Sequence, residues 1–384
     1  MLKLIGTYLL IMICRKCDAS ATILIRKEYW YCNTCFITNT NHKFRACLGK
    51  SKTISSNEKV LICLSGGAES TVLLDLVHCG FTLNGTKKLR IIPFFLHIIE
   101  TTTEDSIKKA NLIIEQCKQY NFNLYLININ EYYSTNNNIL SDPNIIPKTK
   151  SDTLNNIRLN VSPSIYHDLI IKIKRQLFLR IAKELDCKTV FTAETTTQLA
   201  KKLLCNLALG RGSQVENDIG FADLREKSVR ILRPMKDIMN EEIDYFVKVK
   251  QLSPVYDYSN TEIGLQSVIN NFVVDLQDNY PSTIFTVCKT ADKIGSNENT
   301  NDVKNCTLCQ SNITLESANL TAVDATIFSR QMCFKQADAH DDIEVTRNIS
   351  EDKNPMFPSI YETLCYSCSR TYSELDICEI PHTN

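Results

Sequence analysis

Glycine and proline are scarce in this 384-residue sequence, which contains 11 and 10 of them. The sequence also lacks an apolar run as long as the roughly 18 residues of a membrane-spanning helix. These absences exclude collagen-like and other fibrous chains, and we expect no membrane contact. Hydrophobic residues make up 43% and charged residues 22%. This composition is typical of a globular chain with one large domain and appendages, or with two domains.

An excess of one charge is missing as well, because 43 Lys and Arg residues balance 43 Asp and Glu residues. A neutral chain does not coat nucleic acid through its overall charge, so an RNA contact would need a local basic face or a second subunit. The apolar first 13 residues have no basic leader of any length and no small-residue cleavage site before Cys14. We therefore expect a protein that is not secreted.

Cysteine, in contrast, is abundant: there are 17, and eight of them form four Cys-x-x-Cys pairs. Two thiolates separated by two residues can bind one metal ion together, and the regular pairing differs from a secreted disulfide scaffold. We therefore expect a reducing, cytoplasmic compartment. The first two pairs, with 14 residues between them, flank a predicted β-hairpin at Thr22–Tyr31 and have the spacing of a four-cysteine zinc ribbon. Iron–sulfur clusters also use thiolates, but this spacing favours zinc.

The two C-terminal pairs are separated by 55 residues, which is too far for spacing alone to join them. If the polar stretch 338–358 loops out as a disordered insertion, the four thiols could form a second four-cysteine zinc site. Cys333 and Cys378 are alternative ligands for that site. The eight predicted zinc ligands are Cys14, Cys17, Cys32, Cys35, Cys306, Cys309, Cys365 and Cys368.

Apolar strand-like runs alternate with helix-like periodic segments through the middle of the chain, which predicts a mostly parallel sheet with helices on both faces. Strands are expected at Val60–Leu64, Leu89–Ile99, Phe122–Ile129, Thr189–Thr192 and Val229–Leu232, and helices at Ser70–His78, Glu104–Tyr120, Ile165–Leu185, Thr197–Leu209 and Glu241–Lys250. The intervals 130–163 and 295–304 are expected to be loops, the first of them long. The predicted parts are a zinc ribbon with a basic linker (1–55), an α/β domain (56–255) and a C-terminal segment with the second zinc site (256–384).

A glycine turn joins the first of these strands to its helix. The two glycines allow backbone N–H groups to approach a phosphate, and the hydroxyls and the helix N-terminus add donors. The Gly-x-x-x-x-Gly-Lys-Ser/Thr pattern is absent, so the turn is not a Walker A loop. It is either a nucleotide site or an ordinary strand-to-helix turn. The candidate nucleotide contacts are Ser65, Gly66, Gly67, Glu69, Ser70 and Thr71.

Five basic residues are candidate contacts for RNA or for a partner protein. Lys43, Arg45 and Lys50 surround Phe44, a mixture of cations and an aromatic ring that suits RNA phosphates and bases but also occurs in solvated linkers. Arg211 and Arg233 could each reach a phosphate or a partner carboxylate. Equally, each could have a local role: Arg211 could cap helix carbonyls, and Arg233 closes a strand.

The glycine turn resembles the PP-loop of ATP pyrophosphatases, usually Ser-Gly-Gly-x-Asp-Ser, with Glu69 in place of Asp. With the other motifs, the chain resembles the cytoplasmic tRNA 2-thiolation protein 2 family nearly end to end. The matching segments are Cys14–Cys17, Cys32–Phe36, His42–Lys50, Ser65–Ser70, Leu207–Gly212, Phe221–Asp223, Arg233–Asp237, Cys306–Cys309 and Leu364–Cys368.

The resemblance implies a subunit of the cytosolic complex that 2-thiolates the wobble uridine, position 34, of tRNAs for Lys, Glu and Gln. It implies a catalytic thiolase partner, ATP with Mg²⁺, and sulfur delivered as the thiocarboxylate of a ubiquitin-related modifier. Active thiolases carry a Cys-x-x-Cys where this chain has Ser162–Asp168, and Gly-His-x-x-Asp-Asp where it has Thr192–Thr196. A persulfide requires a thiolate, so we expect a non-catalytic subunit. Cys205 is expected to be a buried core thiol and His97 a structural histidine.

Two other functions stay open at this point. The chain could be a self-sufficient enzyme that adenylates a substrate at Ser65–Ser70 without relaying sulfur. It could instead be a zinc-ribbon interaction module in which the glycine turn is incidental.

Overall fold

A computed structural model describes eleven stretches of the chain, and it divides them between two compact units, 1–296 and 297–384. The described residues are 12–25, 27–51, 53–83, 88–134, 138–147, 153–212, 215–255, 264–293, 305–311, 313 and 364–371. The expected loop at 295–304, the insertion at 338–358, Cys333 and Cys378 therefore lie outside the described residues.

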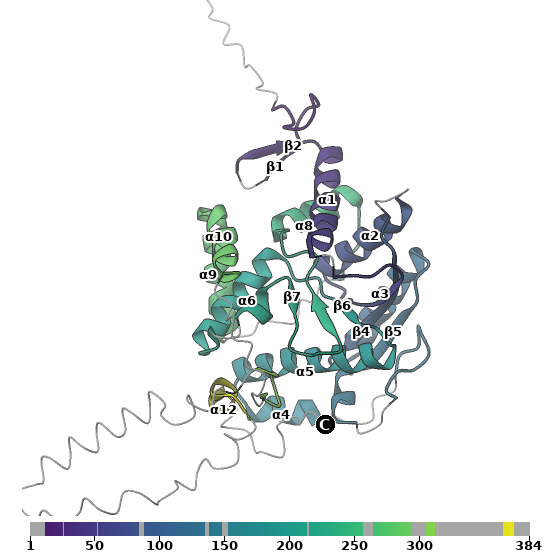
Figure 1. Ribbon diagram of the computed structural model, residues 1–384, viewed down its shortest axis with the longest axis vertical. Helices are drawn as coiled ribbons and strands as arrows, with labels where there is room; N and C mark the ends of the chain where they lie inside the picture. Colours follow the sequence, from purple (N-terminus) through teal and green to yellow (C-terminus); the bar gives the residue numbers. More distant parts are fainter. Residues whose placement is uncertain are drawn as a thin grey trace, which may run out of the picture. The chain divides into compact units, whose positions relative to one another are not determined.

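The first unit is built on a six-stranded sheet, and the predicted α/β fold is confirmed (Figure 1). The strand order is β5-β4-β3-β6-β8-β7, and only β7, at one edge, runs antiparallel to its neighbour. The chain fills one half of the sheet from β3 to β5 and then crosses to the other half. Because parallel crossovers are right-handed, the helices of the two halves cover opposite faces. The strands are β3 (Glu58–Cys63), β4 (Ile91–Ile99), β5 (Leu124–Asn128), β6 (Thr189–Phe191), β7 (Ala222–Asp223) and β8 (Arg230–Leu232).

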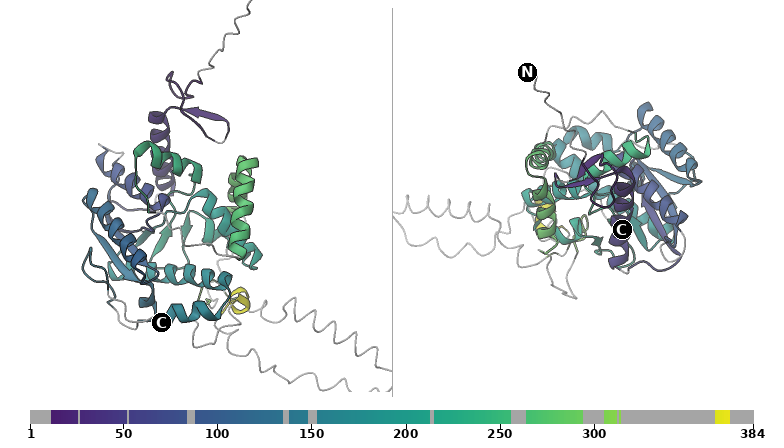
Figure 2. Two further views of the ribbon diagram at one scale, coloured as in Figure 1. Left: turned by 180° about the vertical axis from the view of Figure 1, so that it is seen from behind. Right: turned by 90° about the horizontal axis from the view of Figure 1, so that it is seen from above.

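Each helix predicted from periodicity is present, and Figures 1 and 2 show the helices packed around the sheet. The most apolar of them, α2, buries residues on nearly all its sides, as expected for a helix without a polar face. The helices are α2 (Ala68–Thr82), α3 (Glu104–Gln119), α4 (Thr153–Asn160), α5 (Pro163–Glu184), α6 (Thr196–Ala208), α7 (Val215–Ile219), α8 (Asn240–Lys250), α9 (Leu265–Asn279) and α10 (Pro281–Ala291).

The predicted N-terminal hairpin is also confirmed: β1 (Ile23–Ile25) pairs antiparallel with β2 (Tyr29–Tyr31). The expected basic linker after it was wrong, because Asn33–Ser51 forms a 19-residue helix, α1. Phe36 and Phe44 anchor this helix in the same hydrophobic core as the sheet. The Asn and Thr residues between them have low helix propensity, so tertiary packing rather than local preference stabilises the helix.

The interval 130–163, expected to be one long loop, contains regular structure among its described residues. A 3-10 helix, η2 (Ile129–Tyr133), follows β5, and α4 buries Leu154 and Ile157. Helices α9 and α10, which pack against α6, were not predicted from the sequence. Among the described helices, none has the length and apolar character needed to cross a membrane.

Candidate functional site

The glycine turn lies where the strand order of the sheet reverses. The turn follows β3, and Thr192–Thr196 follows β6, the parallel neighbour of β3. From β3 the chain runs outward to β4 and β5, and it then returns to β6 on the other side. In open α/β sheets this reversal point, at the carboxyl ends of the strands, is where ligands bind. The turn is therefore at the position that a nucleotide would occupy.

Within the turn, the conformation depends on Gly66, whose φ of 89° lies in the left-handed region that favours glycine. A Cβ at Gly66 would also approach Ile113 Cδ1 of α3 to 2.7 Å. The Gly66 N–H donates to Ser70 Oγ (2.9 Å), and the Ser70 hydroxyl donates to the Gly67 carbonyl (3.1 Å). Thr71 Oγ1 also donates to the Gly67 carbonyl, at 3.0 Å. The Gly66 N–H and the hydroxyls of Ser70 and Thr71, which were expected to donate to a phosphate, thus donate hydrogen bonds within the turn itself.

Glu69, which stands where the PP-loop pattern has Asp, joins the two sides of the reversal point. Its Oε1 accepts from Gln198 Nε2 on α6 at 2.7 Å and from Asn240 Nδ2 on α8 at 3.5 Å. Gln198 belongs to the capping box that begins α6, together with Thr195. The longer Glu side chain therefore ties the N-termini of α2, α6 and α8 together.

A pocket opens beside the turn, and its lining includes two carboxylates and one lysine. Asp244 and Glu69 bring negative charge, and Lys109 of α3 is the cation. Burial, helped by Glu241, raises the pKa of Asp244. A pocket with more acidic than basic groups is unfavourable for a polyphosphate. The lining residues are Ser65, Gly67, Ala68, Glu69, Lys109, Asp244 and Val255.

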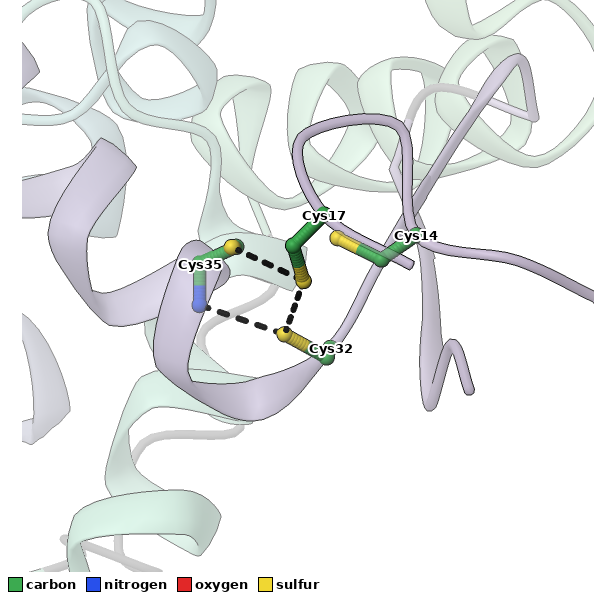
Figure 3. Close-up of side chains that lie close together, drawn as sticks. All are labelled: Cys14, Cys17, Cys32 and Cys35. Carbon is green, nitrogen blue, oxygen red and sulfur yellow. Dashed lines mark hydrogen bonds between the residues drawn. The ribbon is translucent and has the colours of Figure 1, made fainter. Parts of the chain in front are cut away.

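The four N-terminal cysteines converge on one point, as Figure 3 shows. Their sulfur atoms all lie within 4.8 Å of one another, with Cys17 at 3.6 Å from Cys32 and at 3.5 Å from Cys35. Four sulfurs around a tetrahedral Zn²⁺ at about 2.3 Å would be roughly 3.8 Å apart. Cys14 and Cys17 come from a tight turn, and Cys32 and Cys35 come from the junction of β2 and α1. The donor set and its dimensions fit such an ion.

The four C-terminal cysteines form a similar group within the second unit, although 55 residues separate the two pairs. Cys309 Sγ lies 3.6 Å from Cys365 Sγ and 2.7 Å from Ser311 Oγ. The backbone N–H of Cys306 donates to the Ser311 carbonyl at 2.8 Å, which closes a turn around the first pair. The second pair lies at the start of α12 (Tyr366–Thr371). This grouping also fits a tetrahedral ion.

Comparisons with known proteins match the chain to one protein family over nearly its whole length. A curated relative from Drosophila virilis, a cytoplasmic tRNA 2-thiolation protein 2, is 30% identical over 97% of this chain and 92% of its own length. The chain belongs to the cytoplasmic tRNA 2-thiolation protein 2 family. The Aedes aegypti relative is 28% identical over 95% of this chain and 92% of its own, and the family model itself matches residues 264–370. The family description is cytoplasmic, which confirms the expected location.

Among solved structures, the chain is similar to the U34-tRNA thiolase NcsA from Methanococcus maripaludis, determined with its [4Fe-4S] cluster. The TM-score is 0.58 at 19% identity, and the match covers 74% of this chain and 88% of that one. At this identity the likeness shows a shared fold alone.

In this family member, two of the predicted tRNA contacts are buried inside the protein. Arg211, 5% exposed, makes a bidentate ion pair with Asp168 at 2.5 and 2.7 Å. Arg233, 2% exposed, donates to Glu194 Oε2 at 2.6 Å and to the Gly220 carbonyl at 2.8 Å. Both guanidinium groups are thus bound inside the fold, and the backbone N–H of Arg211 also donates to the Asn206 carbonyl in the last turn of α6, at 2.7 Å. Buried guanidinium groups need such partners, because an unpaired buried charge is very unfavourable.

The three basic residues of α1 that were predicted as contacts differ in their exposure and in their bonding partners. Lys43 is ion-paired with the buried Glu242 of α8. Arg45 is half-buried, and its Nε donates to the Asn41 carbonyl one turn earlier, at 3.2 Å. Lys50 is exposed in the last turn of the helix. Of the three, Lys43 is held inside the fold and Lys50 is on the surface.

A group of ion pairs at the edge strand β7 was not predicted from the sequence. Arg175 and Arg225 both bind Asp223, at 2.7 Å each, and Arg225 also binds Asp218 at 2.5 Å. Burial alone would raise the pKa of Asp223, but the two arginines hold it well below its usual range. The partners are up to 48 residues apart in sequence, so no local pattern could have revealed them.

Three thiols outside the two cysteine groups are poor nucleophiles. Burial raises the pKa of Cys63, of Cys205 and of Cys288, the last to about 11. The thiolate is the reactive form, so these side chains stay protonated at neutral pH. His97 is buried, its Nδ1 is 2.8 Å from the Leu64 carbonyl, and burial lowers its pKa to about 4. It is thus a neutral structural histidine, and Cys205 is a half-buried thiol packed against α9.

Proposed function

We propose that this chain is the non-catalytic subunit of the complex that 2-thiolates wobble uridine 34 in tRNAs for Lys, Glu and Gln. Its partner is a catalytic thiolase subunit, and the sulfur comes from the thiocarboxylate of a ubiquitin-related modifier. The family assignment supports a role in tRNA thiolation. The observation that carries the non-catalytic role is the absence of a cysteine from Ser162–Asp168, where the resemblance places the catalytic pair.

Local structure at that position supports the same proposal. Ser162 is the N-cap of α5, and its Oγ accepts from the Ile165 N–H at 3.4 Å. One turn later, Asp168 is held by Arg211 and Lys172. The site is thus occupied by a helix cap and by a buried ion pair, neither of which transfers sulfur. The nearby thiols are kept protonated by burial, so they do not replace the missing pair.

Both four-cysteine groups bind structural zinc in this proposal. Zn²⁺ suits four thiolates in tetrahedral geometry, and a closed four-ligand site leaves no open position for a substrate. Cys14, Cys17, Cys32 and Cys35 would hold one ion, and Cys306, Cys309, Cys365 and Cys368 would hold the other. Each ion would fix turns that have little hydrophobic core of their own.

The turn Ser65–Thr71 is, in this proposal, a PP-loop that keeps its shape and has weak affinity for ATP and Mg²⁺. Its hydroxyls and the Gly66 N–H bond within the turn, and Glu69 is held by Gln198 and Asn240. A nucleotide would have to break these bonds before its phosphates reached the backbone donors. Adenylation of the uridine is therefore assigned to the partner subunit.

The test is mass spectrometry of wobble 2-thiouridine in tRNA from cells that lack this chain. We expect the modification to be lost and to return with the wild-type chain. Affinity purification of the tagged chain should recover a thiolase subunit. Unchanged 2-thiouridine without the chain would refute the function.

A separate measurement distinguishes the self-sufficient enzyme. The purified chain alone is expected to catalyse no ATP–pyrophosphate exchange above background. Exchange by the chain in the absence of any partner would favour an adenylating enzyme and would contradict the non-catalytic role.

A further inference from the structure

The positive charge of this neutral chain is concentrated at its N-terminal end. The first 52 residues contain nine Lys and Arg residues and only two acidic residues, Asp18 and Glu28, a net charge of +7. The remainder of the chain must then carry −7, because the total is zero. A Zn²⁺ ion bound by four thiolates would contribute about −2 and leave the segment clearly positive. Such a local excess attracts a polyanion even though the whole protein is neutral.

Two lysines of this segment are aligned along one flank of α1. Lys16, from the first cysteine turn, reaches Asn39 of α1, with Nζ 3.4 Å from Oδ1. Lys50 is 11 residues after Asn39, and 11 residues make three helical turns plus about 20°. Asn39 and Lys50 therefore lie on the same side of α1, roughly 17 Å apart along the helix axis. Both lysines are exposed. Figure 1 shows the cysteine turn and the hairpin at the beginning of α1, and Lys50 is in its last turn.

An arginine extends this flank at the hairpin, where it stacks on Tyr29, whereas Trp30, the next residue of β2, faces the other side of the hairpin. The Arg15 N–H donates to the Trp30 carbonyl at 2.8 Å, and the Arg15 guanidinium lies 4.1 Å from the centre of the Tyr29 ring. The stacked ring limits the rotation of the guanidinium, which keeps its N–H groups at the surface. Trp30 pairs across the hairpin with Leu24 and is partly exposed. Cations beside aromatic rings suit the phosphates and bases of RNA.

We propose that Arg15, Lys16 and Lys50, held in place by the first four-cysteine group and by α1, form the tRNA-binding surface of this chain. The inference rests on the proposed function, which supplies the RNA. Lys43 does not belong to the surface, because Glu242 neutralises it. Lys27 donates to the Asp278 carbonyl at 2.6 Å and anchors the tip of the hairpin. The surface therefore starts at the cysteine turn and ends at the last turn of α1.

Because Trp30 is the only tryptophan and lies on β2 next to Tyr29, its fluorescence reports binding near the hairpin. The experiment titrates the zinc-loaded, full-length chain with an unmodified transcript of a tRNA that has U34. Binding should change the emission. For the double variant Lys16→Ala with Lys50→Ala, the slope of log K against log salt should become shallower by about 1.5. Each of the two lost phosphate contacts should account for roughly 0.7 to 0.9 of this change. Between 50 and 200 mM salt, the affinity advantage of the wild type should then shrink about eightfold.

The matched control is Lys118→Ala, which removes an exposed lysine from α3. It should leave the salt slope unchanged, and all the variants should keep the wild-type zinc content and melting temperature. An unchanged slope in the double variant would overturn the proposal. A Trp30 signal that appears with the purified thiolase subunit but not with tRNA would also overturn it and would identify a protein interface.

These outcomes are separable from those of the proposed function. If cells without the chain keep their 2-thiouridine while the purified chain still binds tRNA through this surface, only the function fails. If the modification is lost without the chain while the double variant binds tRNA as the wild type does, only the surface fails.

Discussion

At the scale of single residues, Glu69 shows how one methylene group changes the use of a loop. A carboxylate of this length reaches the amides of Gln198 and Asn240, whereas an aspartate would be too short by about 1.5 Å. We expect Glu69→Ala to lower the free energy of unfolding by about 1 kcal/mol, the usual worth of such hydrogen bonds. Urea unfolding of the variant measures this. Glu69→Gln keeps a carbonyl acceptor and should lose less of the free energy of unfolding. An equal loss in both variants would show that the charge of Glu69, rather than its hydrogen bonds, stabilises the protein.

The half-buried carboxylate Glu194 should contribute to stability except in strong acid. Burial raises its pKa, but Lys202 and Arg233 hold it at about 2, below the value of 4.5 for an unpaired glutamate. A carboxyl whose pKa is lowered by folding stabilises the protein above its unfolded pKa, and the contribution disappears as the pH falls through the folded value. The stability advantage of wild type over Glu194→Gln should therefore be constant above about pH 5 and shrink toward pH 2. Denaturant unfolding at several pH values tests this, and an advantage that does not depend on pH would contradict it.

At the scale of secondary-structure elements, α1 has the greatest consequence for the fold. Its buried face carries Phe44, which is 1% exposed. Phe44→Ala should destabilise the protein by about 3 to 5 kcal/mol, because it leaves a cavity in the shared core. Phe272→Ala on α9 is the matched control, since that ring is 51% exposed and its loss should change stability by less than about 0.5 kcal/mol. Equal effects in thermal melts would mean that α1 is not part of the core.

The elements also show what the sequence could and could not predict. Most strands and helices from 58 to 250 follow from apolar periodicity and from glycine turns, because each pattern is local; the short elements η2, α4, α7 and β7 were not predicted. Helix α1 was missed because its Asn and Thr residues resemble a linker and its stability comes from Phe36 and Phe44 in a distant core. The partners of Arg211 and Arg233 lie 43 and 39 residues away, so no pattern in the sequence could indicate that these side chains are internal.

At the scale of the whole molecule, the two four-cysteine groups belong to different compact units. We expect two zinc ions per chain by metal analysis. Cys14→Ser and Cys365→Ser should each lower the count to one, because each removes a ligand from only one group. Cys205→Ser, which removes a thiol outside both groups, should leave the count at two. If either ligand variant lost both ions, the two sites would be coupled. The division into 1–55, 56–255 and 256–384 stays a prediction.

The ion pair between Lys43 and Glu242 has a further consequence. Cys35, a predicted zinc ligand, is in the first turn of α1, and Lys43 on the same helix pairs with Glu242, which also accepts from the Met239 N–H at the start of α8. The next residue, Asn240, touches Glu69. The backbone of α1, the Lys43–Glu242 ion pair and the start of α8 thus connect the first cysteine group to the glycine turn. If the first cysteine group holds zinc as proposed, removal of the ion should loosen the glycine turn as well as the hairpin, although the turn itself holds no ligand to the metal.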